Sequence, residues 1–196
     1  STTTKLKGKA TSVIGGVNAG GDSRKDLAFG SGGGADAYNA AYGAVTFNYD
    51  HRLTFDTSFT GKDKLRTRLR TGNFGKNTSA FAGGEYNLTA LDTASGTDNV
   101  VTIDRLFYKF PVSKEVTFIV GPEARNTESL AMWPSKYNKG GAKILDFFAV
   151  AGVPGVYNKE TGALIAAYWK QKVAKGDPAF SISANYVADH DEGADS

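Results

Sequence analysis

The chain has 196 residues, 22% of them charged and 40% hydrophobic, so we expect one folded domain over residues 1–196 and no chain-wide disorder. A net charge of +3 is too small to indicate a nucleic-acid-binding protein, and the lack of cysteine excludes disulfides and thiolate-bound metals. The 24 glycines and the many Phe and Tyr residues favour a β-rich protein with numerous turns.

The first strand is predicted over Thr4–Val17, and the Gly- and Ala-rich segment Asn18–Gly43 that follows it is predicted to be a loop. The clearest pattern comes next, over Val45–Phe59, where odd positions are mostly apolar and even positions are polar. A period of two over this length exceeds the usual strand of roughly five or six residues. It is long enough for a strand that crosses a bilayer, which needs about 9–11 residues.

Leu65–Thr71 continues the same alternation after a predicted hairpin turn at Gly61–Lys64. Three arginines occupy even positions of this second strand. They are therefore predicted to share one side of the sheet with Arg52 and Asp56. In a soluble sandwich that side would face solvent, whereas in a barrel it would face the lumen.

The remaining strands have weaker patterns. They are predicted at Glu85–Leu91, Val100–Phe110, Val116–Gly121, Ala163–Val173 and Ala179–Val187. A change of parity near Asp104 and Arg105 predicts a β-bulge or a strand that leaves the wall. Pro122–Gly162 is a long segment in which we expect a short helix at Lys143–Val150. Long segments that alternate with tight turns are typical of outer-membrane barrels.

Several segments resemble the cyanobacterial outer-membrane porins known as iron-uptake porins, within the wider carbohydrate-selective porin group. The segments are "FDTSFTGKDKLRTRLRTGNF", "IDRLFYKFP", "WPSKY", "LDFFA" and "GVPGVYN", and the similarity extends over Ala44–Asn158. The resemblance implies a transmembrane antiparallel β-barrel. About eight of its strands are expected in this chain, as the N-terminal part of a larger barrel, because open channels need about twice that number.

The resemblance also implies an outer-membrane location, contact with the lipid bilayer and assembly as a homotrimer. It implies a channel for inorganic ions and small solutes, iron species among them. Members of the group carry a cell-wall-anchoring SLH domain and a coiled coil before the barrel. Neither module is present in these residues, so contact with the cell wall is expected through modules outside this chain.

The candidate pore-lining residues are charged side chains predicted on the lumen side: Arg52, Asp56, Arg66, Arg68, Arg70, Asp104 and Arg105. Stacked cations on a pore wall create a positive field that favours anions. In the alternative interpretation, carboxylates such as Asp50 and Asp56 neutralise the arginines, and the pairs only hold the shape of the barrel. Asp104 and Arg105 fit either a structural pair or a constriction.

No catalytic set is recognisable, because the chain lacks a cysteine nucleophile and a GxSxG motif. His51 is expected at an interface or membrane rim, and His190 in a solvated acidic tail rather than a metal site. No cofactor and no metal are therefore expected. A group of aromatic residues in the long segment fits either a loop folded into the pore or contact with a neighbouring protomer: Trp133, Tyr137, Phe147 and Phe148.

Two functions of different class remain open. One is a diffusion porin. The other is a non-transporting outer-membrane β-barrel that acts as a surface-binding or structural protein.

Overall fold

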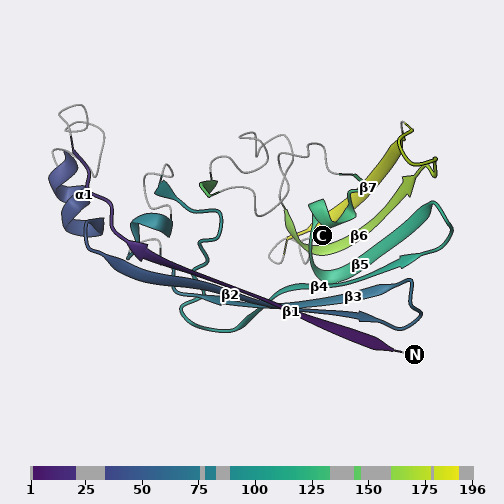
Figure 1. Cartoon of the computed structure of the whole chain (residues 1–196), viewed down its shortest axis with the longest axis horizontal. Helices are drawn as coiled ribbons and strands as arrows, with labels where there is room; N and C mark the ends of the chain where they lie inside the picture. The colour runs from purple at the N-terminus through teal and green to yellow at the C-terminus, as the bar shows by residue number, and fades with distance from the viewer. Residues whose placement is uncertain are drawn as a thin grey trace.

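The computed structural model describes residues 2–20, 34–75, 78–82, 89–132, 144–146, 160–177 and 179–189. They form one antiparallel sheet of seven strands, each hydrogen-bonded to the next in chain order (Figure 1). The strands are β1 (Thr3–Gly15), β2 (Thr46–Ser58), β3 (Lys64–Gly72), β4 (Thr102–Pro111), β5 (Val116–Arg125), β6 (Thr161–Lys170) and β7 (Ser181–Ala188). The predicted all-β antiparallel class is confirmed.

One expectation about the elements differs from the structure. The predicted loop Asn18–Gly43 is wrong for its last part, because Gly34–Tyr42 forms the helix α1. The alanines of "GADAYNAAY" favour a helix, and the ring of the buried Tyr38 contacts the tilted ring of Tyr42 at a centroid distance of 5.3 Å. No described helix is long and apolar enough to cross a membrane.

Two predicted elements lie largely outside the described residues. Of the predicted strand Glu85–Leu91, residues 89–91 are described, and Leu91 forms an isolated bridge with Leu145. Of the helix expected at Lys143–Val150, only residues 144–146 are described. His190 and the four aromatic residues Trp133, Tyr137, Phe147 and Phe148 also lie outside the described part.

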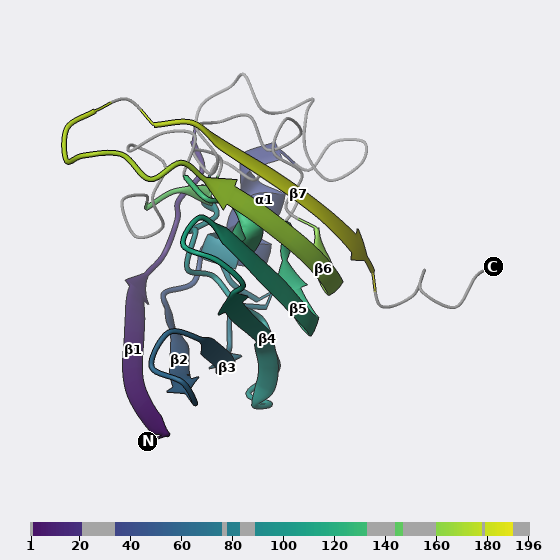
Figure 2. The same ribbon diagram turned by 90° about the vertical axis from the view of Figure 1, so that its right-hand side faces the viewer.

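The sheet is curved but not closed. Figure 2 shows it bending from β1 round to β7, and Figure 1 shows α1 at the far end of β1 and β2. We call the inner side of this curve the concave face and the other side the convex face. β1 and β7 are the two edges, and no pairing joins them among the described residues. Closure into a barrel therefore stays a prediction.

The connections differ in length at the two ends of the sheet. The connections at one end comprise residues 59–63, 112–115 and 171–180, and those at the other end comprise residues 16–45, 73–101 and 126–160. The short turns lie together on the right of Figure 1. We call this end the short-turn end.

The β2–β3 turn is organised by one carboxylate. Asp63 accepts hydrogen bonds from the hydroxyls of Ser58 and Thr60, at 2.7 and 2.8 Å, and from the backbone N–H groups of Phe59 and Thr60. The Tyr108 hydroxyl of β4 donates a further bond at 2.6 Å. These donors, the Tyr108 hydroxyl first, hold the pKa of Asp63 well below its usual range, so the carboxylate that fixes the turn stays ionised at neutral pH.

Candidate functional site

The arginine column of β3 lies on the concave face. In the register of β2 with β3, Arg66 is opposite Asp56, Arg68 is opposite Thr54, and Arg70 is opposite Arg52. Directly opposed residues of an antiparallel pair project to the same face. The prediction that Arg52, Asp56 and the three arginines share a face is therefore confirmed. That this face lines a pore stays a prediction.

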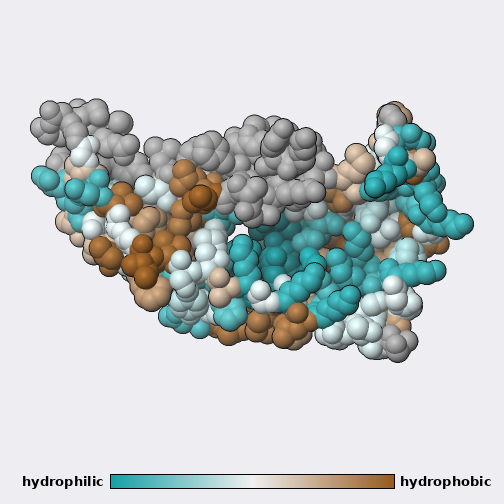
Figure 3. Space-filling view, viewed as in Figure 1, coloured by the Kyte–Doolittle hydropathy of each residue, from teal (hydrophilic) through white to brown (hydrophobic). Residues whose placement is uncertain are grey.

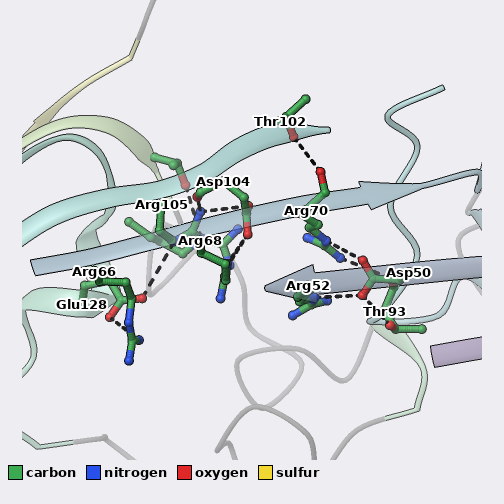
Figure 4. Close-up of polar contacts among 12 residues, drawn as sticks. Asp50, Arg52, Arg66, Arg68, Arg70, Thr93, Thr102, Asp104, Arg105 and Glu128 are labelled. Atoms are coloured by element: carbon green, nitrogen blue, oxygen red, sulfur yellow. Dashed lines mark hydrogen bonds and ion pairs between the residues drawn. The ribbon is translucent and has the colours of Figure 1, made fainter. Parts of the chain in front are cut away.

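Each arginine of the column is bound to a carboxylate. Arg66 makes a bidentate pair with Asp56, at 2.8 Å from Nε and 2.9 Å from Nη2. Arg68 pairs with Asp104, and Arg70 pairs with Asp50 at 2.7 Å (Figure 4). The neutralisation considered in the alternative interpretation is thus present on this wall.

Asp104 reaches the column because β4 contains a bulge. In the register of β3 with β4, Arg68 is opposite Arg105 and Leu69 is opposite Ile103. Asp104 is therefore the extra residue between Ile103 and Arg105. The parity change predicted near Asp104 and Arg105 is therefore a bulge. It brings two consecutive residues to the concave face, where Asp104 binds Arg68 and also lies 3.2 Å from Nη1 of the buried Arg105. The structural pair is present, and a role in a constriction stays a prediction.

Asp50 is the most enclosed charge of the site. Its side chain has no exposed surface, and it accepts bonds from Nε of Arg52 at 2.8 Å and Nε of Arg70 at 2.7 Å. A third bond, at 2.9 Å, comes from the hydroxyl of Thr93. Thr93 belongs to the connection 73–101, and its carbonyl also accepts a bond from Arg70 Nη2 at 3.2 Å. The described part of this connection is therefore folded onto the concave face.

Further contacts hold the same connection against β2 and β3. The buried Ser79 donates a hydrogen bond of 2.9 Å to the side chain of Asn48. A Cβ at Gly72 would lie 2.4 Å from the carbonyl oxygen of Ser95 and 2.8 Å from that of Tyr49. Glycine is thus required at position 72, because any side chain there would displace the connection from the sheet.

The first described part of the connection 126–160 also lies over the concave face. It begins with the 3-10 helix η4 (Asn126–Ser129), whose Glu128 carboxylate lies 4.0 Å from Arg66 and 3.8 Å from Arg105. Beyond η4, the N–H of Ala131 donates to the hydroxyl of Ser183 on β7 at 3.1 Å.

The two connections meet through backbone hydrogen bonds. The N–H of Asp92 donates to the carbonyl of Ile144, and the N–H of Asp146 donates to the carbonyl of Ala90, at 2.9 and 2.8 Å. The hollow of the sheet is therefore crossed by chain that is anchored to the same wall as the arginines. This arrangement narrows any passage along that wall.

The convex face has the opposite character. Its residues, read from the pairing register, are mostly apolar, with threonines among them on β3, and many of them are exposed. Examples with more than two fifths of their surface exposed are Leu6, Ile14, Phe47, Ile103, Phe118, Val120, Ile165, Ile182 and Tyr186. Figure 3 shows hydrophilic side chains in the hollow and hydrophobic ones along the lower edge of the molecule. An exposed apolar surface of this extent marks contact with a membrane or another protein.

Aromatic side chains gather on the convex face at the short-turn end. The rings of Phe59, Tyr108, Phe110 and Phe118 follow one another at centroid distances of 6.2, 5.2 and 6.1 Å. The indole N–H of Trp169 donates at 3.0 Å to Glu115 in the β4–β5 turn, much as Tyr108 donates to Asp63. Such rings, with an apolar body and a polar edge, suit the boundary between lipid and water.

Three kinds of residue in this site were missed by sequence reasoning. Lys5, Lys7 and Lys9 of β1 lie on the concave face, and their alternation in "KLKGK" was the available signal. Thr93 and Glu128 come from connections whose folding onto the sheet has no local sequence signal.

The described residues contain no group of three or more His, Cys, Asp or Glu able to hold a metal ion.

Comparison with known proteins identifies two cyanobacterial relatives. The uncharacterized protein sll0772 of Synechocystis sp. is 30% identical over 123 residues, which cover 62% of this chain and 19% of the relative. The uncharacterized protein alr4550 of Nostoc sp. is 33% identical over 139 residues, which cover 67% of this chain and 21% of the relative. The chain thus spans about a fifth of the length of these curated relatives. No family model and no solved structure matches the chain.

Proposed function

We propose that this chain is part of the wall of an outer-membrane diffusion porin that passes inorganic ions and small solutes. The observation that carries the proposal is the two-faced sheet. Its convex face exposes apolar side chains on successive strands. Its concave face carries paired and unpaired charges on β1 to β4 and a small buried apolar cluster over β4 to β6. Such a sheet separates lipid from water when it is closed into a barrel.

The dimensions of the sheet support the proposal. The strands have 8 to 13 residues, and a tilted strand needs about 9–11 residues to cross the hydrocarbon core. The short turns gather at one end and the long connections at the other, as in outer-membrane barrels. The aromatic rings at the short-turn end correspond to one of the two girdles of such barrels.

The concave face supports passage of small solutes rather than binding of a particular one. The described parts of the connections 73–101 and 126–160 fold over it and restrict the space, while the arginines and carboxylates provide a hydrated, charged wall. The outer-membrane location, the homotrimer and iron species as cargo rest on the family resemblance and are part of the proposal. The lipid bilayer is the partner that the convex face fits.

Planar-bilayer recording of the full-length protein tests this function. We expect discrete conductance steps that persist over time, because a water-filled barrel remains open without a ligand. The same preparation after heat denaturation serves as the control and should give no steps. Stable insertion without any steps would contradict the porin and favour a non-transporting outer-membrane β-barrel with a surface-binding or structural role.

A further inference from the structure

The charges of the concave face are distributed unevenly across the strands. On β2, β3 and β4, five arginines lie within ion-pair distance of four carboxylates: Arg52, Arg66, Arg68, Arg70 and Arg105 with Asp50, Asp56, Asp104 and Glu128. Nearly all of their positive charge is therefore balanced locally. A field that attracts mobile anions must come mainly from cations without such partners.

Three exposed cations of this kind stand in a row on β1. Lys64 and Lys109, which are half-buried, and Lys170, at the end of β6, also lie on the concave face without a carboxylate within ion-pair distance among the described residues. Lys5, Lys7 and Lys9 pair in register with Asp56, Thr54 and Arg52 of β2, so they lie on the concave face, with β2 between them and the arginine column of β3. All three are exposed, and among the described residues no carboxylate is within ion-pair distance of them. Asp56, the acidic residue opposite Lys5, is already engaged by both nitrogens of the bidentate Arg66 pair.

The spacing of the lysines allows a small anion to move from one ammonium group to the next. Alternate residues of a strand are separated by roughly 7 Å, and the Debye length is about 10 Å at 0.1 M salt. The fields of neighbouring ammonium groups therefore overlap, and an anion that leaves one group is already attracted by the next. A row of exposed, hydrated ammonium groups binds weakly enough to release the ion, which conduction requires.

We propose that Lys5, Lys7 and Lys9 form the anion-selecting element of this wall and favour small inorganic anions such as chloride. The inference rests on the proposed pore. It adds that the pore favours anions and that the three β1 lysines cause this preference. The paired arginines then shape the wall, and the β1 lysines contribute a row of exposed, unbalanced charge.

Reversal potentials across planar bilayers in a potassium chloride gradient test the lysine column. The triple variant Lys5→Gln, Lys7→Gln, Lys9→Gln is expected to lower the chloride-to-potassium permeability ratio by about three- to tenfold at 0.1 M salt. The matched control replaces one exposed lysine in each short turn, Lys62→Gln, Lys114→Gln and Lys175→Gln. It removes the same charge away from the concave face and should leave the ratio unchanged.

Further variants separate the possible outcomes. The triple variant Lys5→Arg, Lys7→Arg, Lys9→Arg keeps the charge and should retain the wild-type ratio. Conductance steps with an unchanged ratio in the glutamine variant would overturn the role of the lysines while leaving the porin intact. Absence of steps from the wild-type protein would overturn both. The lysines are a cleaner test than the arginines, because removing an arginine also frees its carboxylate.

Discussion

Replacement of Asp50 by asparagine is expected to lower the free energy of unfolding by about 2–5 kcal/mol, because it removes one partner of a buried charge cluster. The carboxylate has no exposed surface and compensates both Arg52 and Arg70. The neutral amide leaves these two guanidinium groups close together without a counter-charge. It also leaves the bond from Thr93 weaker, which loosens the connection 73–101 from the sheet.

Urea unfolding of the protein reconstituted in lipid vesicles measures this change. The matched control is Asp177→Asn, the same substitution at an exposed position in the β6–β7 turn, where a change within about 0.5 kcal/mol is expected. An Asp50 variant as stable as this control would show that the cluster is solvated and structurally dispensable.

Replacement of Ile165 by arginine tests the environment of the convex face. Ile165 lies in the middle of β6, and 66% of its surface is exposed. If that surface faces lipid at the bilayer midplane, the Ile165→Arg substitution is expected to lower the free energy of unfolding by about 2–4 kcal/mol. If it faces water, a surface substitution of this kind changes stability by only about 0.5 kcal/mol.

Urea unfolding in lipid vesicles measures the loss of stability in the Ile165→Arg variant, with Val112→Arg as the control. Val112 is 55% exposed but lies in the β4–β5 turn, outside the strands, so arginine there should be tolerated. Equal stability of the two variants would exclude a lipid-facing position for Ile165.

The local pattern of the sequence was sufficient to predict the hairpin of β2 and β3. Alternation has a period of two, so each side chain of Val45–Phe59 is assigned to a face without knowledge of the rest of the fold. The turn is also local, because Gly61 adopts a positive φ of 85° and Asp63 binds donors within five residues, apart from Tyr108. The bulge at Asp104 was predictable for the same reason, since it reverses the parity of β4.

What the sequence could not predict depends on contacts between distant residues. Thr93 and Asp50 are 43 positions apart, and Asn48 and Ser79 are 31 positions apart. Neither pair belongs to a repeating pattern, so the folding of the connection 73–101 onto the concave face was not foreseeable. The lysines of β1 were overlooked because Gly8 and Ala10, on the opposite face, give a weak apolar signal.

The central claim is that water contacts one face of the sheet and lipid the other. Because the chain has no cysteine, single cysteines can be introduced at Thr54 and Phe55, which are adjacent in β2 and lie on the concave and convex faces. In outer membranes, a membrane-impermeant thiol reagent should modify Thr54→Cys rapidly and Phe55→Cys hardly at all. A fluorophore attached at position 55, but not at 54, should be quenched by brominated lipid. Equal modification at both positions, with no quenching at 55, would contradict the membrane wall and the porin proposed from it.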